Sequence, residues 1–115
     1  MSQIDLDSVL IASGTAISAQ VNLGDKTICG FHMPAVWTAA VLSFQVSPDN
    51  GQTWREWLDA KGAVQTFTVA QGQYAAVDPA LFRGFNLIKL RSGTAGAPVN
   101  QGQDSTIIVA SKRIF

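Results

Sequence analysis

The chain has 115 residues and a mass of 12.2 kDa, the size of a single domain with its own hydrophobic core. Eight Lys and Arg balance eight Asp and Glu, and charged residues make up only 14% of the sequence. This composition excludes a basic nucleic-acid-binding surface, and no apolar run has the length of a membrane-spanning helix. The single cysteine, Cys29, excludes an internal disulfide. The first residues are acidic where a signal peptide is basic, so we expect no such peptide.

Short segments rich in Val, Ile and Thr, with alternating apolar and polar residues, predict β-strands along the whole chain. In chain order the predicted strands cover residues 4–12, 15–23, 27–32, 38–47, 53–58, 63–70, 73–77, 86–91 and 105–114. In the second of these, Ile17, Ala19, Val21 and Leu23 are expected to share one face. The helical signal lies at residues 78–84, where Asp78 can cap a short turn that begins at Pro79.

Many short strands separated by turn signals are typical of an antiparallel sandwich or barrel. We therefore predict one all-β domain over residues 1–115, a β-sandwich of about eight strands of the jelly-roll or a related Greek-key type. No internal repeat or linker divides the chain.

Residues 47–54 read SPDNGQTW and resemble an Asp-box, a local turn motif of β-hairpins. Asp49 can accept hydrogen bonds from the backbone of its own turn, and Gly51 can adopt the positive φ that a tight turn needs. Trp54 can then pack its ring against the hairpin. In sialidase-like propellers the motif recurs in each blade away from the active site, so here we predict a structural turn.

The three tryptophans, Trp37, Trp54 and Trp57, could form a platform on which a sugar stacks. Trp54 and Trp57 are three residues apart, so a regular strand puts them on opposite faces. The simpler interpretation is that two of the three lie in the core and one lies at an edge. Trp57 is the one that we expect to be exposed.

Residues 92–103 read SGTAGAPVNQGQ and form an uncharged segment between two predicted strands. One interpretation is a mobile hairpin tip, and the other is a loop that becomes ordered against a neighbouring subunit. Arg91 precedes this segment and shares a strand face with Lys89. Both side chains can simply be solvated, or Arg91 can bind a carboxylate or loop carbonyl groups of a partner chain through two hydrogen bonds.

The sequence offers little for catalysis, and we expect no enzymatic activity, no cofactor and no metal. His32 is the single histidine, and Cys29 lies three residues before it. On a strand these two side chains point to opposite faces, which argues against a nucleophile–base pair. The acidic residues form no recognisable catalytic pair.

Three segments carry a family resemblance. They are MPAVWTAA at residues 33–40, LSFQVSPDNGQTW at residues 42–54 and KLRSGTAGAPVNQ at residues 89–101. Over about residues 20–110 the chain resembles small β-rich structural proteins of tailed bacteriophages and prophages, which include capsid decoration or cement proteins. The resemblance implies a virion component, assembled in the host cytoplasm, that often forms trimers on the shell. It transfers no functional residue.

We therefore expect a non-enzymatic capsid decoration protein that stabilises the shell through contacts with itself and with the major capsid protein. A neck or tail protein of the virion and a carbohydrate-binding module for host attachment are the alternatives. The expected partners are further copies of the chain, with a trimer favoured, but neither nucleic acid nor a membrane. The residues expected at the partner interface are Arg91, Asn100, Gln101 and Trp57.

Overall fold

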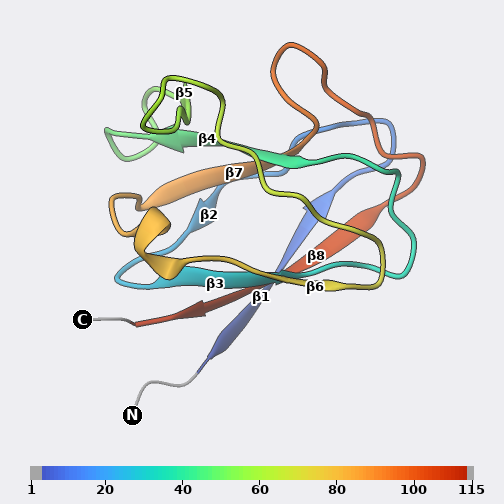
Figure 1. Ribbon diagram of the computed structural model, residues 1–115, viewed down its shortest axis with the longest axis horizontal. Coiled ribbons are helices and arrows are strands. Elements are labelled where there is room, and N and C mark those ends of the chain that lie inside the picture. The colour runs from blue at the N-terminus through green and yellow to red at the C-terminus, as the bar shows by residue number, and fades with distance from the viewer. Residues whose placement is uncertain (1–3, 114–115) are drawn as a thin grey trace.

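The computed structural model describes residues 4–113 as two four-stranded antiparallel sheets that pack against each other (Figure 1). Sheet A has the strand order β1-β8-β3-β6, and sheet B has the order β2-β7-β4-β5. The strands are β1 (Asp5–Ile11), β2 (Val21–Asn22), β3 (Thr27–His32), β4 (Leu42–Ser47), β5 (Arg55–Glu56), β6 (Tyr74–Ala76), β7 (Leu87–Ser92) and β8 (Ser105–Lys112). A short 3-10 helix, η1 (Pro79–Phe82), lies between β6 and β7.

The strand order is that of a jelly roll. Consecutive strands change sheet at every step except from β4 to β5, and the first and last strands are neighbours at one side of sheet A. The predicted all-β sandwich of about eight strands is therefore confirmed. At one side of the sandwich both sheets end in an edge strand, β1 in sheet A and β2 in sheet B.

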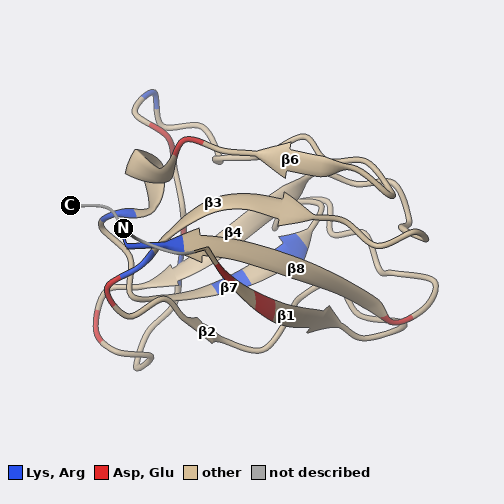
Figure 2. Ribbon diagram, turned by 90° about the horizontal axis from the view of Figure 1, so that it is seen from below, with Lys and Arg blue, Asp and Glu red and all other residues tan. Residues whose placement is uncertain are grey.

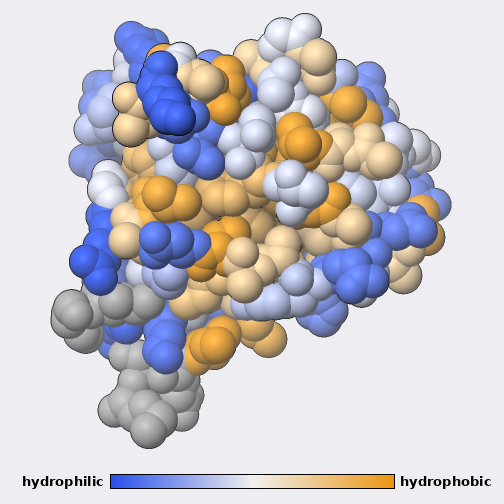
Figure 3. All heavy atoms as spheres, in the orientation of Figure 1, coloured by the Kyte–Doolittle hydropathy of each residue, from blue (hydrophilic) through white to orange (hydrophobic). Residues whose placement is uncertain are grey.

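The core lies between the sheets and is aromatic at its centre. Phe31 from β3, Phe44 from β4 and Phe82 from η1 are fully buried, with ring centroids 5.5–6.3 Å apart. Phe67 joins them from the segment between β5 and β6, where its backbone amide and carbonyl each bond to Leu42 at 2.9 Å. This segment crosses the front of the molecule in Figure 1, and hydrophobic residues gather over it and over η1 in Figure 3. It closes this side of the sandwich.

The predicted helical turn is also confirmed. The side chain of Asp78 accepts a hydrogen bond from the backbone N–H of Ala80 at 3.0 Å, and Pro79 occupies the first turn. The hydroxyl of Thr27 donates to the Pro79 carbonyl, which fixes η1 against the beginning of β3.

The strand predicted over residues 15–23 is wrong for most of its length, because only Val21–Asn22 is a strand. Ser18, predicted on the polar face, is buried, while Ile17 is exposed. The Ser18 hydroxyl accepts a hydrogen bond from the Leu90 N–H at 3.0 Å and donates to the Ala19 carbonyl at 2.8 Å. The Ser18 hydroxyl thus takes the place of a backbone carbonyl as the acceptor for Leu90, and the ladder of backbone hydrogen bonds with β7 is interrupted here.

Three other predicted strands are shorter than expected. Of residues 38–47, Leu42–Ser47 forms β4. Residues 63–70 form isolated bridges at Val64 and Phe67 and no continuous ladder. Of residues 53–58, Arg55–Glu56 pairs with β4. Residue 114, the predicted end of the last strand, lies outside the described residues.

Candidate functional site

The outer face of sheet A is the candidate functional surface, because it is apolar and lacks charge at its centre. The strand register gives two rows of outward residues that run across all four strands. One row is Leu6, Ala110, Gly30 and Ala76, and the next is Ser8, Ile108, His32 and Tyr74. Figure 2 looks onto this sheet and shows Lys and Arg residues at one end of β8 and acidic residues on β1, with the middle of the sheet free of both.

Several large apolar side chains on this face are open to solvent. Leu6 is 65% exposed, Tyr74 52% and Leu10 48%, and Ile4, in line with them just before β1, is 54% exposed. A single exposed leucine is ordinary in a monomeric protein. Among residues 4–113, four of the nine exposed large hydrophobic residues share this face, three along the β1 edge and Tyr74 on β6, and an exposed apolar patch marks an interaction surface.

Tyr74, on the edge strand β6, is the aromatic residue of this patch. Its ring lies over Gly30 of the neighbouring strand, so closely that a Cβ atom added to Gly30 would lie 2.8 Å from the Tyr74 Cε2. The ring also meets His32 edge-on, with centroids 6.5 Å apart. Glycine at residue 30 therefore leaves the space that the Tyr74 ring occupies, and an exposed aromatic side chain is the type of residue that anchors protein interfaces.

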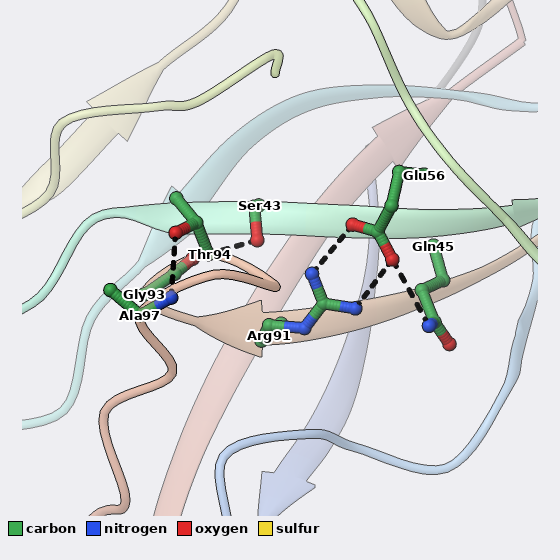
Figure 4. Close-up of polar contacts among 7 residues, drawn as sticks. All are labelled: Ser43, Gln45, Glu56, Arg91, Gly93, Thr94 and Ala97. Atoms are coloured by element: carbon green, nitrogen blue, oxygen red, sulfur yellow. Dashed lines mark hydrogen bonds and ion pairs between the residues drawn. The ribbon is translucent and has the colours of Figure 1, made fainter.

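Arg91 lies on the outer face of the other sheet and has a partner within the chain. Its guanidinium binds Glu56 through two hydrogen bonds of 2.6 and 2.7 Å, and Gln45 donates a third to the same carboxylate at 3.1 Å (Figure 4). Arg91 is only 6% exposed. These hydrogen bonds, above all those from Arg91, hold the pKa of Glu56 below its usual value, although partial burial opposes them. The predicted bidentate contact with a carboxylate exists, and the carboxylate belongs to this chain.

Residues 92–103 contain a tight, hydrogen-bonded turn. The backbones of Thr94 and Ala97 bond to each other at 3.1 and 3.2 Å, and the Ser43 hydroxyl donates to the Gly93 carbonyl at 2.7 Å (Figure 4). The Ser92 hydroxyl donates to the carbonyl of Val99 across the base of the turn. The tip itself, residues 95–98, is exposed.

The two amides after this turn, Asn100 and Gln101, differ sharply in environment. Asn100 is exposed, whereas Gln101 is 1% exposed. The Gln101 side chain accepts from the Thr38 N–H at 2.9 Å and from the Ser105 hydroxyl at 3.1 Å, and it donates to the Thr38 carbonyl at 3.1 Å. Gln101 therefore stabilises the fold through contacts within the chain. The Asn100 side chain is exposed and accessible to a partner.

Trp57 is not the exposed tryptophan that the sequence suggests. Its ring centroid lies 4.7 Å from that of Phe85 and 5.1 Å from that of Phe82, so the ring packs within the aromatic core. Trp54 points to the opposite face, as predicted, and Lys89 Nζ covers its ring at 4.4 Å. Trp37 is buried, with its indole N–H bonded to the Ala40 carbonyl. Within residues 4–113 no two tryptophan rings are in contact, so these side chains do not build a common stacking platform.

The turn at residues 47–54 has the predicted structure. Asp49 accepts hydrogen bonds from the Thr53 N–H at 2.8 Å and from the Thr53 hydroxyl at 2.7 Å, and Gly51 has φ of +92°. The hydrogen bonds from Thr53 lower the pKa of Asp49. Asn50 also adopts a left-handed conformation, with φ of +59°.

Cys29 and His32 are not brought together as a catalytic pair. Cys29 is the bulged residue of β3, and its Sγ lies 3.8 Å from the Thr27 carbonyl oxygen. His32 is exposed beside Tyr74 on the outer face. Among residues 4–113, no group of three His, Cys, Asp or Glu side chains is placed to hold a metal ion. The described part of the chain also contains no helix with the length and hydropathy needed to cross a membrane.

Comparisons of the chain with family models, with curated proteins and with solved structures found no match.

The sequence analysis did not identify the outer face of sheet A as a candidate surface, although the sequence contains a signal for it. In residues 4–12 both alternating sets contain large apolar residues, Ile4, Leu6 and Leu10 in one set and Val9 and Ile11 in the other. A strand that faces the core on one side and water on the other has one apolar set.

Proposed function

We propose that this chain is a non-enzymatic structural protein that works by packing against other subunits of an assembly. We propose further, from the resemblance in sequence, that the assembly is the virion of a tailed phage and that the chain decorates its capsid. The observation that carries the first part is the apolar outer face of sheet A, with Leu6 and Leu10 exposed on β1 and Tyr74 exposed on β6. The second part rests on the resemblance in sequence.

The chemistry of this surface favours a protein partner. The centres of protein interfaces are depleted in charged residues and enriched in aromatic ones, because burial of a charge requires an exact counter-charge. A partner that covers Leu6, Leu10 and Tyr74 would remove apolar area from water and would bury no carboxylate at the middle of the face. The balanced formal charge of the chain also keeps the repulsion between neighbouring copies small.

The experiment that tests the virion role is quantitative mass spectrometry of phage particles purified from the source strain. Hundreds of copies of the chain per particle would support capsid decoration, because decoration proteins follow the symmetry of the shell. A copy number equal to one or two rings would move the protein to the neck or tail. Absence from purified particles would contradict the proposal.

A matched pair of variants tests whether the sheet A surface is the one that is used. Tyr74 and Leu58 are both 52% exposed, but Leu58 lies in the segment after β5. We expect Tyr74→Lys to reduce incorporation into particles at least about tenfold, since a buried lysine without a counter-charge is costly. Leu58→Lys is expected to incorporate like the wild type. Equal incorporation of both variants would show that the partner binds elsewhere.

A further inference from the structure

β1 is an edge strand of sheet A, and its residues 8–10 line a pocket together with residues 19–21. β1 pairs with β8 through all seven of its residues, and among residues 4–113 no strand pairs with its other side. Figure 2 shows β1 at the border of the sheet, on the opposite side of β8 from β3. Leu6, Ser8 and Leu10 are exposed there. A long open edge strand is a template for pairing with another strand.

The hydrogen-bond pattern shows which residues of β1 offer free backbone groups. Met33 N–H bonds to the Gln73 carbonyl and Val77 N–H to the Cys29 carbonyl, so odd-numbered residues of β3 pair with β6. Even-numbered residues of β3 then face β8, where Gly30 lies opposite Ala110 and His32 opposite Ile108.

Along β8 the backbone hydrogen-bonding groups also alternate between the two neighbouring strands. Its even-numbered residues face β3, so its odd-numbered residues face β1, where Ile107 pairs with Val9 and Val109 with Asp7. The backbone groups of Leu6, Ser8 and Leu10 therefore point to the open edge. The side chains of the same three residues project from the outer face.

We propose that two copies of this chain pair through β1, antiparallel and around a two-fold axis at Ser8, to form one continuous sheet. Each Ser8 would then exchange two backbone hydrogen bonds with Ser8 of the partner subunit. Leu6 would lie opposite Leu10 of the partner subunit, and Leu10 opposite Leu6 of the partner subunit. The sequence of the edge is thus complementary to itself, as a two-fold contact requires.

The charges on β1 favour this register over its neighbours. With the axis at Ser8, Asp7 lies opposite Val9 of the partner subunit, and no two carboxylates face each other. With the axis at Asp7, the two Asp7 side chains would be directly opposite, which is unfavourable. With the axis at Val9, Leu10 would face a serine and the leucine pairs would be lost. Asp5 already has an ion-pair partner in Lys26 of its own chain.

The pairing deepens the proposed function, on which it rests, because it supplies a self-contact for an assembly protein. It joins the apolar outer faces of two copies of sheet A into one surface, with the leucines of both copies at its centre. The second copy is the favoured occupant because the free donors, the free acceptors and the apolar side chains all match under the same two-fold operation.

The first test is the mass of the chain in solution across a concentration series, measured by light scattering or sedimentation velocity. We expect a monomer–dimer equilibrium that approaches twice 12.2 kDa. Ser8→Pro removes the N–H that the partner needs but no hydrogen bond to β8, and proline is tolerated on an open edge. We expect it to raise the Kd of the dimer at least about tenfold. The control Ser8→Ala keeps the N–H and should leave the Kd unchanged.

A second test does not depend on the behaviour of the proline variant. In a hydrogen-bonded antiparallel pair the two Cα atoms lie about 5.5 Å apart, within the range that a disulfide spans. Ser8→Cys in a Cys29→Ser background should therefore form a covalent dimer under mild oxidation. Thr106→Cys in the same background is the control, because Thr106 is exposed on the same face but lies on β8, away from the open edge.

The outcomes separate the pairing from the virion role. A monomer at all concentrations, a trimer, or an Ser8→Cys variant that cross-links no faster than Thr106→Cys would overturn the pairing. A trimer matters here because the resemblance in sequence implies it and a contact around a two-fold axis cannot produce it. If the chain is present in particles and Ser8→Pro is incorporated normally, the virion role stands without the pairing. If the chain is dimeric but absent from particles, the pairing stands alone.

Discussion

At the scale of single residues, the neighbours Asn100 and Gln101 show how burial divides two similar side chains. Both were expected to face a partner. Gln101 is 1% exposed, and its amide holds both backbone groups of Thr38. It ties the segment before β4 to the segment before β8, two stretches far apart in the sequence. Asn100 is exposed and makes no comparable link in the described structure.

This difference predicts very different costs for the same substitution. Gln101→Ala should lower the free energy of unfolding by about 2–3 kcal/mol, because it removes a buried amide with three hydrogen bonds, one of them from the buried Ser105 hydroxyl. Asn100→Ala should change it by less than about 0.5 kcal/mol, as is usual for an exposed position. Urea denaturation of the two variants measures both values. Similar effects in the two variants would contradict the structural role given to Gln101.

At the scale of the elements, local pattern predicted the strands that lie in continuous ladders. β3 has the predicted bounds, and β1 and β7 differ from prediction by one residue at each end. The failure at residues 15–23 arose because Ser18 takes the place of a backbone acceptor for Leu90. This hydrogen bond joins residues that are far apart in the sequence, so the alternation of apolar and polar residues around Ser18 could not predict it.

The candidate surface was harder to predict than the strands. Apolar residues on both faces of residues 4–12 can indicate a buried strand as well as an interface. Only the sheet order, with β1 at an edge, shows that Leu6 and Leu10 remain in water. In the same way, the sequence indicated that Arg91 could bind a carboxylate, but the pairing of β4 with both β5 and β7 identifies Glu56. The exposure of the leucines and the partner of Arg91 both depend on the order of strands in the sheets, which the local periodicity of the sequence does not predict.

The turn after β7 gives a prediction at this scale. Gly93 has φ of +84°, and a Cβ atom there would lie 2.8 Å from the Val99 nitrogen and closer still to the Ala97 carbonyl oxygen. Gly93→Ala should therefore destabilise the protein by at least about 1–3 kcal/mol, from backbone strain and from a contact that only backbone movement can relieve. Gly96→Ala is the control, because the same added atom meets nothing within 4 Å. Thermal unfolding measures the melting temperatures of both variants, and we expect that of Gly93→Ala to be lower. Equal melting temperatures would contradict a tightly packed turn.

At the scale of the whole molecule, three carboxylates in separate places stabilise the fold in their ionised form. The pKa of Glu56 is lowered by Arg91, that of Asp49 by its hydrogen bonds from Thr53, and that of Asp25 by Arg113. Each group therefore binds its proton less readily in the folded than in the unfolded chain. The stabilisation is complete above the unfolded pKa values and is lost as the pH falls through the folded ones. Acid should weaken the sandwich at several points at once.

Glu56 provides the sharpest test, because it is the least exposed of the three and is bound bidentately to a buried arginine. At about pH 7 we expect Glu56→Gln to lower the free energy of unfolding by about 1–2 kcal/mol, since Arg91 loses its counter-charge. At about pH 3 the wild-type carboxyl is largely protonated in the unfolded chain, so the difference between the two proteins should shrink. Urea titrations of both proteins over this range measure the convergence. A difference that stays constant with pH would mean that the Glu56 side chain acts through packing, and that its ion pair with Arg91 contributes little to the fold.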